Sequence, residues 1–124
     1  ALSDIDSSTH RWNTSGSMSV VTQTGFGTGK ANTAAVMAQY TGDMWGLIGT
    51  QVAQGWFVPS SEEWSAFAGE LGISSNYSNF GLSDYYWSSS QGNTSRALYA
   101  NFNNGYLNNV TVRNYYYVRL SATF

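Results

Sequence analysis

The chain changes composition sharply at residue 85, and this break constrains both its fold and its function. All seven acidic residues of the 124-residue chain precede residue 85, whereas the last forty residues contain three Arg and no acid. The same forty residues hold seven of the nine Tyr and seven of the eleven Asn. We therefore expect one α+β domain over residues 1–124, with two short helices early and an antiparallel, hairpin-rich sheet late.

Composition also excludes several classes of function. The formal net charge is -2 and only 10% of the residues are charged, which is unsuited to following a nucleic-acid backbone. No stretch approaches the roughly 18 apolar residues of a membrane span, and the first residues lack the basic and apolar regions of a signal peptide. Because cysteine is absent, disulfide scaffolds, thiol nucleophiles and cysteine-based metal sites are excluded as well.

The clearest helix is predicted from about Ser61 to Leu71. Ser60 and Glu63 match a capping box, in which each side chain satisfies a free amide of the first turn. Glu62 and Glu63 diverge as neighbours on a helix, so they indicate a helix start rather than a catalytic pair of carboxylates. Four apolar residues spaced at i, i+3, i+4 and i+7 predict one buried stripe: Trp64, Phe67, Ala68 and Leu71. A shorter helix is predicted over Asn32–Tyr40.

After residue 72 the pattern favours strands. The candidates are rich in aromatic and β-branched residues, and they are Tyr85–Ser90, Ala97–Phe102, Tyr106–Val112 and Tyr115–Leu120. Asn104-Gly105 predicts a two-residue hairpin turn between the second and third, since both positions accept positive φ. Two earlier short strands are predicted at Met18–Gln23 and Trp56–Val58.

The sequence offers little catalytic or metal-binding chemistry. The loop at residues 25–30 resembles a phosphate loop, but Thr24 and Ala31 stand where that motif needs Gly and a hydroxyl, so it indicates a flexible loop entering a helix. The single histidine, His10, is expected in a surface loop, and Asp4 with Asp6 makes at best a weak cation site. We expect no catalytic residue, no metal and no cofactor.

A surface rich in Tyr, Asn, Ser and Gly remains, and composition leaves two interpretations of it open. Tyr supplies stiff contact area with a polar tip, while Asn and Ser adapt their hydrogen bonds, as in antibody-like binding surfaces. The same composition suits a sheet whose tyrosine rings cover the core and one another.

The order of residues resembles a known family. The matching segments are residues 86–90 (Tyr-Trp-Ser-Ser-Ser), Ala97, residues 101–105 (Asn-Phe-Asn-Asn-Gly), residues 117–119 (Tyr-Val-Arg) and Phe124, with residues 27–33 and 56–60 upstream. In these segments the chain resembles the variable proteins of diversity-generating retroelements, which carry a C-type lectin fold. The resemblance implies that residues from about 85 to 124 are the diversified segment.

In this family a reverse transcriptase copies a template with errors at adenines, and Asn codons of the AAC kind are the usual targets. Such codons cannot reach Lys, Glu, Gln, Met or Trp. Within residues 85–124 only Trp87 and Gln91 lie outside the reachable set. The composition of this segment is therefore the one that such sampling leaves.

The resemblance divides the segment into constant and variable positions. The constant scaffold, expected to be buried or conformationally required, comprises Trp87, Ala97, Ala100, Phe102, Gly105, Val118 and Phe124. The variable, ligand-binding positions are Asn93, Ser95, Arg96, Leu98, Tyr99, Tyr106, Leu107, Arg113, Asn114 and Tyr115. We expect most of the variable side chains to project from one contiguous exposed face, with Tyr99 and Tyr106 brought together by the turn at Asn104-Gly105.

The resemblance thus implies a non-catalytic binding module for a protein or cell-surface receptor, within a larger surface protein or virion assembly such as a phage tail fibre. A carbohydrate-binding lectin and a non-diversified structural domain of the same fold are the alternatives. Calcium-dependent lectins use Glu-Pro-Asn or Gln-Pro-Asp ligands, and the single proline, Pro59, belongs to neither motif. Lectin-fold oxidases that generate formylglycine need a cysteine pair, which this chain lacks.

Overall fold

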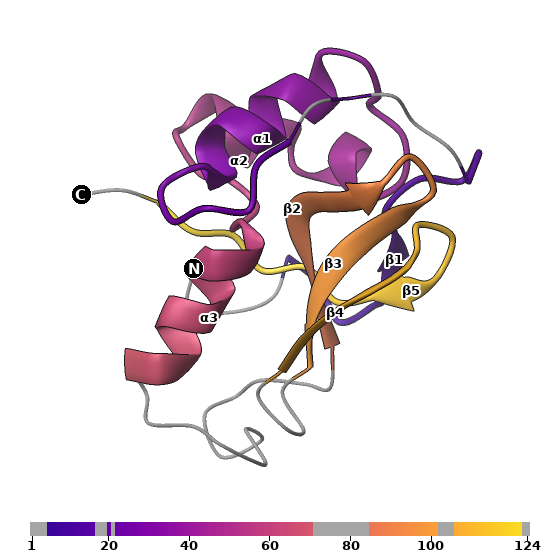
Figure 1. The fold of residues 1–124 in the computed structure, drawn as a ribbon. Helices are drawn as coiled ribbons and strands as arrows, with labels where there is room; N and C mark the ends of the chain where they lie inside the picture. The colour runs from indigo at the N-terminus through magenta and orange to yellow at the C-terminus, as the bar shows by residue number, and fades with distance from the viewer. Residues whose placement is uncertain (1–4, 17–19, 21, 71–84, 102–105, 123–124) are drawn as a thin grey trace.

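The computed structural model describes residues 5–16, 20, 22–70, 85–101 and 106–122. In chain order its elements are β1 (His10–Arg11), α1 (Gly29–Met37), the 3-10 helix η1 (Asp43–Leu47), α2 (Gly49–Ala53), α3 (Ser61–Glu70), β2 (Tyr85–Asn93), β3 (Arg96–Asn101), β4 (Tyr106–Thr111) and β5 (Tyr115–Tyr116). Apart from the short β1, helices precede strands, so the α+β prediction is confirmed (Figure 1). The two short elements η1 and α2 were not predicted, because neither is long enough to show a helical apolar period.

The strands form two separate antiparallel sheets. One has the order β2-β3-β4, and the other joins β1 to β5, which are about a hundred residues apart in the sequence. Side-chain contacts place α3 and the β1–β5 pair on opposite sides of the three-stranded sheet: Tyr86 packs on Trp64 of α3, whereas Trp87 packs on Tyr116 of β5 (Figure 1). The β2-β3-β4 sheet is therefore the central layer.

The predicted turn at Asn104-Gly105 lies outside the described residues. The register of the flanking strands, with Asn101 opposite Tyr106, differs by two positions from the one that a two-residue turn at Asn104-Gly105 would give. Such a shift leaves every side chain on its own face, so the alternation of the sequence could not distinguish the two registers.

Three strand predictions were too long or wrong. Of the predicted strand Tyr115–Leu120 only Tyr115–Tyr116 is a strand, and Trp56–Val58 is reduced to one bridge between Phe57 and Ser121. Val20, Thr22 and Gln23, the described part of Met18–Gln23, are not in a strand. These segments satisfy their backbone groups through single bridges and side chains instead of ladders.

The capping box at the start of α3 is confirmed. The Ser60 amide donates to Glu63 Oε1 at 2.7 Å, and the Glu63 amide donates to Ser60 Oγ at 3.3 Å. The same Glu63 oxygen accepts the amide of Gly29, the first residue of α1, at 2.9 Å. A Cβ on Gly29 would lie 2.8 Å from the Val58 carbonyl oxygen and 2.9 Å from the Ser60 amide nitrogen, so the close approach of the two helix starts requires glycine here. The structural interpretation of the glutamate pair is supported, since Glu62 also accepts an amide, that of Phe26.

The buried stripe of α3 is narrower than predicted. Trp64 is buried, packs on Tyr86 with ring centroids 5.4 Å apart, and donates its indole N–H to the Trp87 carbonyl at 3.0 Å. Phe67, however, is 41% exposed and covers the edge of Trp64 from the solvent side. The prediction for Phe67 is therefore wrong, because one large ring already fills the space between α3 and the sheet. The side chain of Ala68 and all of Leu71 lie outside the described residues.

The middle of β2 departs from a regular strand. Between Trp87 and Gln91 the register with β3 shifts, so Ser88, Ser89 and Ser90 form an irregular, fully buried segment. Their polar groups are satisfied by distant parts of the chain: Ser88 Oγ donates to the Leu98 carbonyl at 2.7 Å, and the Ser89 amide donates to the Pro59 carbonyl at 2.8 Å. Ser90 Oγ donates to the Gln23 carbonyl and accepts the Ser61 amide. We call residues 88–90 the serine bulge.

Asp43 fixes the N-terminal segment to η1. Its carboxylate accepts the Thr14 amide at 2.7 Å, the Thr14 hydroxyl and the Tyr40 hydroxyl. Burial acts to raise the pKa of Asp43, but these hydrogen bonds and the nearby charge of Arg11 outweigh it and hold the pKa below its ordinary value. Burial and the hydrogen bond to Asp43 raise the pKa of Tyr40.

We predict that Trp64→Ala lowers the free energy of unfolding by about 3–5 kcal/mol, the cost of deleting a large buried aromatic side chain. Phe67→Ala is the matched control, because it removes a ring of the same helix that is partly exposed, and it should cost about 1 kcal/mol. Urea denaturation of both variants measures the difference. Equal losses of unfolding free energy would show that the Trp64 and Phe67 rings contribute equally to stability, against this prediction.

The lowered pKa of Asp43 predicts acid lability. The unfolded chain, with an Asp43 pKa near 3.8, binds more protons than the folded chain as the pH falls. Asp43 therefore stabilises the fold above that pH, and its contribution is lost as the pH falls through the folded pKa. Asp43→Asn should reduce the loss of stability between pH 6 and pH 3 in urea denaturation. Asn accepts the positive φ of 51° at this position, so the substitution does not strain the backbone. An unchanged dependence of stability on pH would contradict the role given to the Asp43 carboxylate.

Candidate functional site

The predicted constant and variable positions differ in burial. Of the constant positions, Trp87, Ala97, Ala100 and Val118 are buried as predicted, whereas Phe102, Gly105 and Phe124 lie outside the described residues. None of the variable positions whose side chains are described is buried. Asn93, Ser95, Arg96, Arg113 and Tyr115 are exposed, and Leu98, Tyr99, Leu107 and Asn114 are half-buried. The side chain of Tyr106 lies outside the described residues.

The variable positions do not share one face, so that prediction is wrong. Successive side chains of a strand point to opposite faces, which separates Leu98 from Tyr99 in β3. Tyr99 lies on the side of Trp87 and packs against Tyr116 of β5. Leu98 lies on the side of α3, where Leu107 stands opposite Ala100. The resemblance grouped the variable positions on one expected face, but the alternation of side chains along β3 divides them between the two faces of the sheet.

Several variable positions also bond to neighbouring parts of the fold. Arg113 donates from Nε to the Thr14 carbonyl at 3.1 Å and from Nη2 to the Ser15 carbonyl at 2.9 Å. Arg96 donates to Asn109 Oδ1 at 3.0 Å. Asn93 accepts the amide and the hydroxyl of Ser95, which orders the turn between β2 and β3. Of these side chains, Arg113 joins the most distant segments.

Tyr115, 53% exposed, borders a pocket of about 290 Å³ between the two sheets. The residues that line this tyrosine pocket are Thr9, Tyr85, Tyr115, Tyr116 and Tyr117. Beneath it, Tyr116 contacts Tyr85, Trp87 and Tyr99 with ring centroids 4.8–5.1 Å apart. The pocket therefore has a rigid aromatic floor and an exposed aromatic edge, as a site for part of a ligand requires.

The Tyr99 phenol is held in its neutral form. Burial raises the pKa of Tyr99, and the neighbouring phenols of Tyr116 and Tyr85 and a hydrogen bond with Tyr116 act in the same direction. Neutral phenols donate and accept hydrogen bonds as well as offering ring faces.

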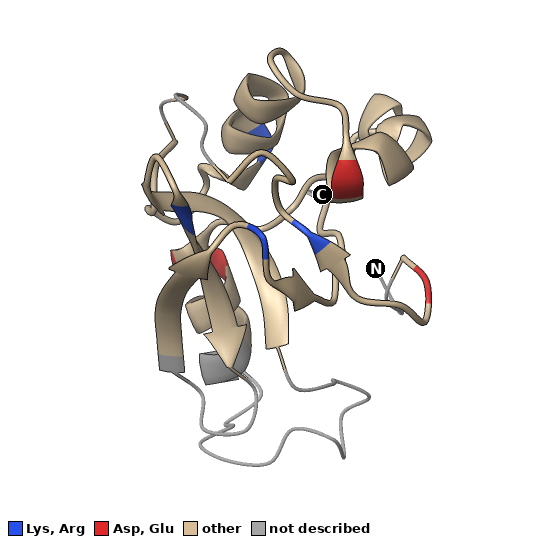
Figure 2. Ribbon diagram, turned by 90° about the vertical axis from the view of Figure 1, so that its right-hand side faces the viewer, with Lys and Arg blue, Asp and Glu red and all other residues tan. Residues whose placement is uncertain are grey.

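The strands around the tyrosine pocket carry positive charge only. The strands of both sheets contain Arg11 and Arg96 and no acidic residue. Figure 2 shows blue segments and no red segment on the strand arrows. The nearest described acids belong to other segments, and both are engaged: Asp43 with Thr14 and Tyr40, and Asp6 with His10.

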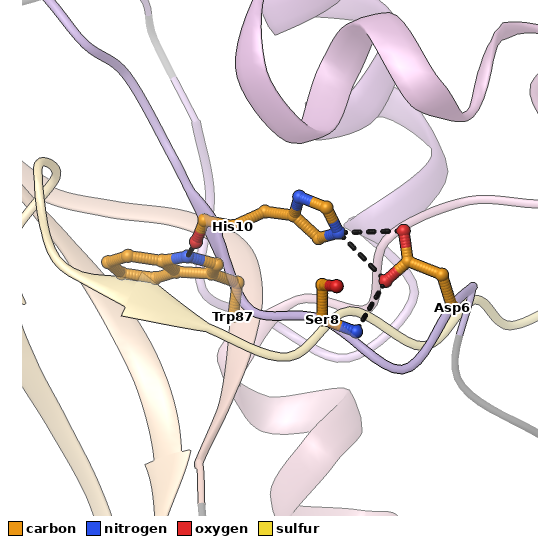
Figure 3. A network of polar contacts seen from close by, with 4 residues as sticks. All are labelled: Asp6, Ser8, His10 and Trp87. Atoms are coloured by element: carbon orange, nitrogen blue, oxygen red, sulfur yellow. Dashed lines mark hydrogen bonds and ion pairs between the residues drawn. The ribbon is translucent and has the colours of Figure 1, made fainter.

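His10 lies in β1 opposite Tyr116, not in the surface loop that we predicted. Its ring nitrogen Nε2 contacts both carboxylate oxygens of Asp6 at 2.9 Å, while its main-chain carbonyl accepts the Trp87 indole at 2.7 Å (Figure 3). Burial acts to raise the pKa of Asp6, but hydrogen bonds from His10 and the Ser8 amide, with attraction to His10, hold it below its ordinary value. This network orders the segment that carries Thr9 and Arg11.

Of the five residues that line the tyrosine pocket, sequence reasoning named only Tyr115 as a binding residue. Tyr85, Tyr116 and Tyr117 were predicted only as parts of strands. Thr9 and Arg11 gave no signal, because their position follows from the pairing of β1 with β5. Such long-range pairing cannot be deduced from a two-residue strand.

A second pocket lies near the turn between β2 and β3. It has a volume of about 370 Å³ and is lined by Val20, Thr22, Gln39, Gln91, Gly92, Asn93 and Thr94. None of these side chains is charged. We call it the amide pocket, since Gln and Asn dominate its polar groups.

Among the described residues no group of three or more His, Asp or Glu side chains could hold a metal ion, while Asp4 and Asp84 lie outside them. Over the same ranges no helix has the length and apolar character needed to cross a membrane.

Comparison with known proteins gave no match for this chain among family models, curated proteins or solved structures.

Proposed function

We propose that this chain is a non-catalytic ligand-binding module with a C-type lectin fold, whose surface is diversified by a retroelement over residues 85–124. One observation carries the proposal: the described positions that resemble the constant scaffold are buried, and those that resemble the variable positions are all exposed or half-buried. A fixed core with substitutable surface positions keeps a binding surface preorganised while its side chains change. The order of elements, helices before an antiparallel sheet, is compatible with this fold.

The ligand in this proposal is a protein or cell-surface receptor, contacted mainly through the side of the sheet that bears the tyrosine pocket. Tyrosine and arginine often anchor protein interfaces, and this side presents Tyr115 beside Arg11. The chain would act at a cell surface or on a virion, as part of a larger assembly. The proposal includes no catalytic step.

Carbohydrate binding is a second candidate, favoured by the amide pocket. Amide and hydroxyl side chains donate and accept hydrogen bonds together, which matches the hydroxyl groups of a neutral sugar. Thr22, Gln91 and Asn93 provide such groups in a cavity large enough for a small ligand. Sugar binding abolished by changes at Gln91 or Asn93, and unaffected by changes at Tyr115, would favour this candidate.

The proposal predicts a specific arrangement of the neighbouring DNA. A near-copy of the segment encoding residues 85–124 should lie beside a reverse transcriptase gene and differ from it at adenines of the copy. The differences should fall in the codons of the variable positions and spare those of Trp87, Ala97 and Ala100. Sequencing the locus decides this, and a locus without such a copy would favour the non-diversified structural domain.

The geometry predicts unequal costs for two tyrosine substitutions. Tyr115→Ser should change the free energy of unfolding by less than about 1 kcal/mol, because Tyr115 is exposed. Tyr99→Ser should cost about 1–3 kcal/mol, since it removes ring contacts with Tyr85 and Tyr116. Urea denaturation of both variants tests this. A larger cost for Tyr115→Ser would show that Tyr115 serves the fold rather than a ligand.

A further inference from the structure

Arg11 lies over the ring of Tyr115, which borders the tyrosine pocket, and its guanidinium has no hydrogen-bond partner among the described residues. The guanidinium carbon lies 4.8 Å from the centroid of the Tyr115 ring. Nε is buried without an acceptor. Asp43 is close enough to feel the charge of Arg11, but its oxygens accept from Thr14 and Tyr40 instead. Arg11 is therefore held by stacking, with its outer N–H groups uncommitted.

The pairing of β1 with β5 places Arg11 on the same face as Tyr115, which borders the tyrosine pocket. His10 lies opposite Tyr116 and Arg11 opposite Tyr115. Because opposite residues of an antiparallel pair share a face, Arg11 and Tyr115 point to one side and His10 and Tyr116 to the other. Thr9, which lines the pocket, is on the side of Arg11 by the same alternation. The guanidinium thus stands beside the exposed edge of the pocket.

The chemistry of this corner matches a carboxylate. A guanidinium presents a planar fork of donors that pairs with both oxygens of a carboxylate. The strands around it carry no acid that could occupy the fork. A nucleic acid would require several cations along a track, whereas the cation stacked on Tyr115 is a single arginine, Arg11. One acidic side chain of a protein ligand fits the single charge.

We infer that Arg11 and the tyrosine pocket together anchor an acidic segment of a protein ligand. A Glu or Asp carboxylate of the ligand pairs with the guanidinium, and a neighbouring apolar side chain of the ligand enters the pocket against Tyr85, Tyr116 and Tyr117. This inference deepens the proposed binding function and rests on it. It assigns a role to a residue outside the diversified segment, so the positive charge that favours an acidic ligand would persist while the variable positions change.

The test uses two short peptides as probes, acetyl-Glu-Phe-Glu-amide and acetyl-Gln-Phe-Gln-amide. Each is titrated into the ¹⁵N-labelled chain and followed by amide and arginine Nε resonances. We expect the Glu peptide to shift the resonances of Arg11 and of residues 115–117, with an affinity about tenfold higher than that of the Gln peptide, as a hydrogen-bonded charge pair contributes.

Three variants isolate the guanidinium. Arg11→Gln should bind the two peptides equally, and Arg11→Lys should keep part of the preference because it retains the charge without the fork. Arg119→Gln is the matched control: Arg119 also lies over a tyrosine ring, that of Tyr86, at 5.8 Å, but on the α3 side of the sheet. Its removal lowers the net charge equally and should leave the preference intact. Thermal melts check that each variant is folded.

The outcomes separate this inference from the proposed function. Equal affinities of the two peptides for the parent chain, with shifts at residues 115–117, would overturn the role of Arg11 and leave the pocket as a ligand site. The same would follow if Arg119→Gln reduced the preference as much as Arg11→Gln. Absence of shifts at the pocket with both peptides would overturn the inference and remove the pocket from the proposed binding surface.

Discussion

Hydrogen bonds from four tryptophan indoles to main-chain carbonyls join the parts of this fold. Trp12 donates to Ser88 and Trp45 donates to Trp12, which connects η1 through the N-terminal segment to β2. Trp64 donates to Trp87, and Trp87 donates to His10, which connects α3 through β2 to β1. Each indole buries a large apolar surface and also satisfies a carbonyl that water cannot reach. In a chain without cysteine, these side chains perform the long-range connection that disulfides provide elsewhere.

The serine bulge shows why local patterns predicted some elements and missed others. Helix α3 and strands β3 and β4 were predictable, because their caps, periods and β-branched residues agree with their final environment. Ser88, Ser89 and Ser90 are polar yet fully buried, and nothing local indicates which distant groups satisfy them. Their partners at Pro59, Gln23 and Leu98 come from three separate segments. Burial of this kind follows from the tertiary fold.

The burial of the candidate positions was predictable from the sequence, whereas their arrangement in space was not. Resemblance to the family separated buried from accessible positions in the described part of residues 85–124. It could not show that Leu98 and Tyr99 lie on opposite faces of the sheet. That conclusion requires the alternation of side chains along β3 and the residues that pack on each face. Nor could it add Thr9, which lines the tyrosine pocket, or Arg11, which stacks on Tyr115, because the positions of both depend on the pairing of β1 with β5.

The variable positions differ in how much substitution the fold can absorb. Asn93, Arg96 and Tyr115 are exposed and lie in or beside turns and strand ends, so exchange there alters mainly the surface. Tyr99 stacks on Tyr116, and the Arg113 guanidinium packs over Gly16, whose φ of +78° and close contact leave no room for a side chain. Diversity at those two positions would change the floor of the tyrosine pocket and the anchoring of the N-terminal segment. A retroelement acting on this chain would therefore change the floor of the tyrosine pocket at Tyr99 as well as its exposed edge at Tyr115. The hydrogen bond from the Trp87 indole to the His10 carbonyl would still hold β1, and with it Arg11, in place.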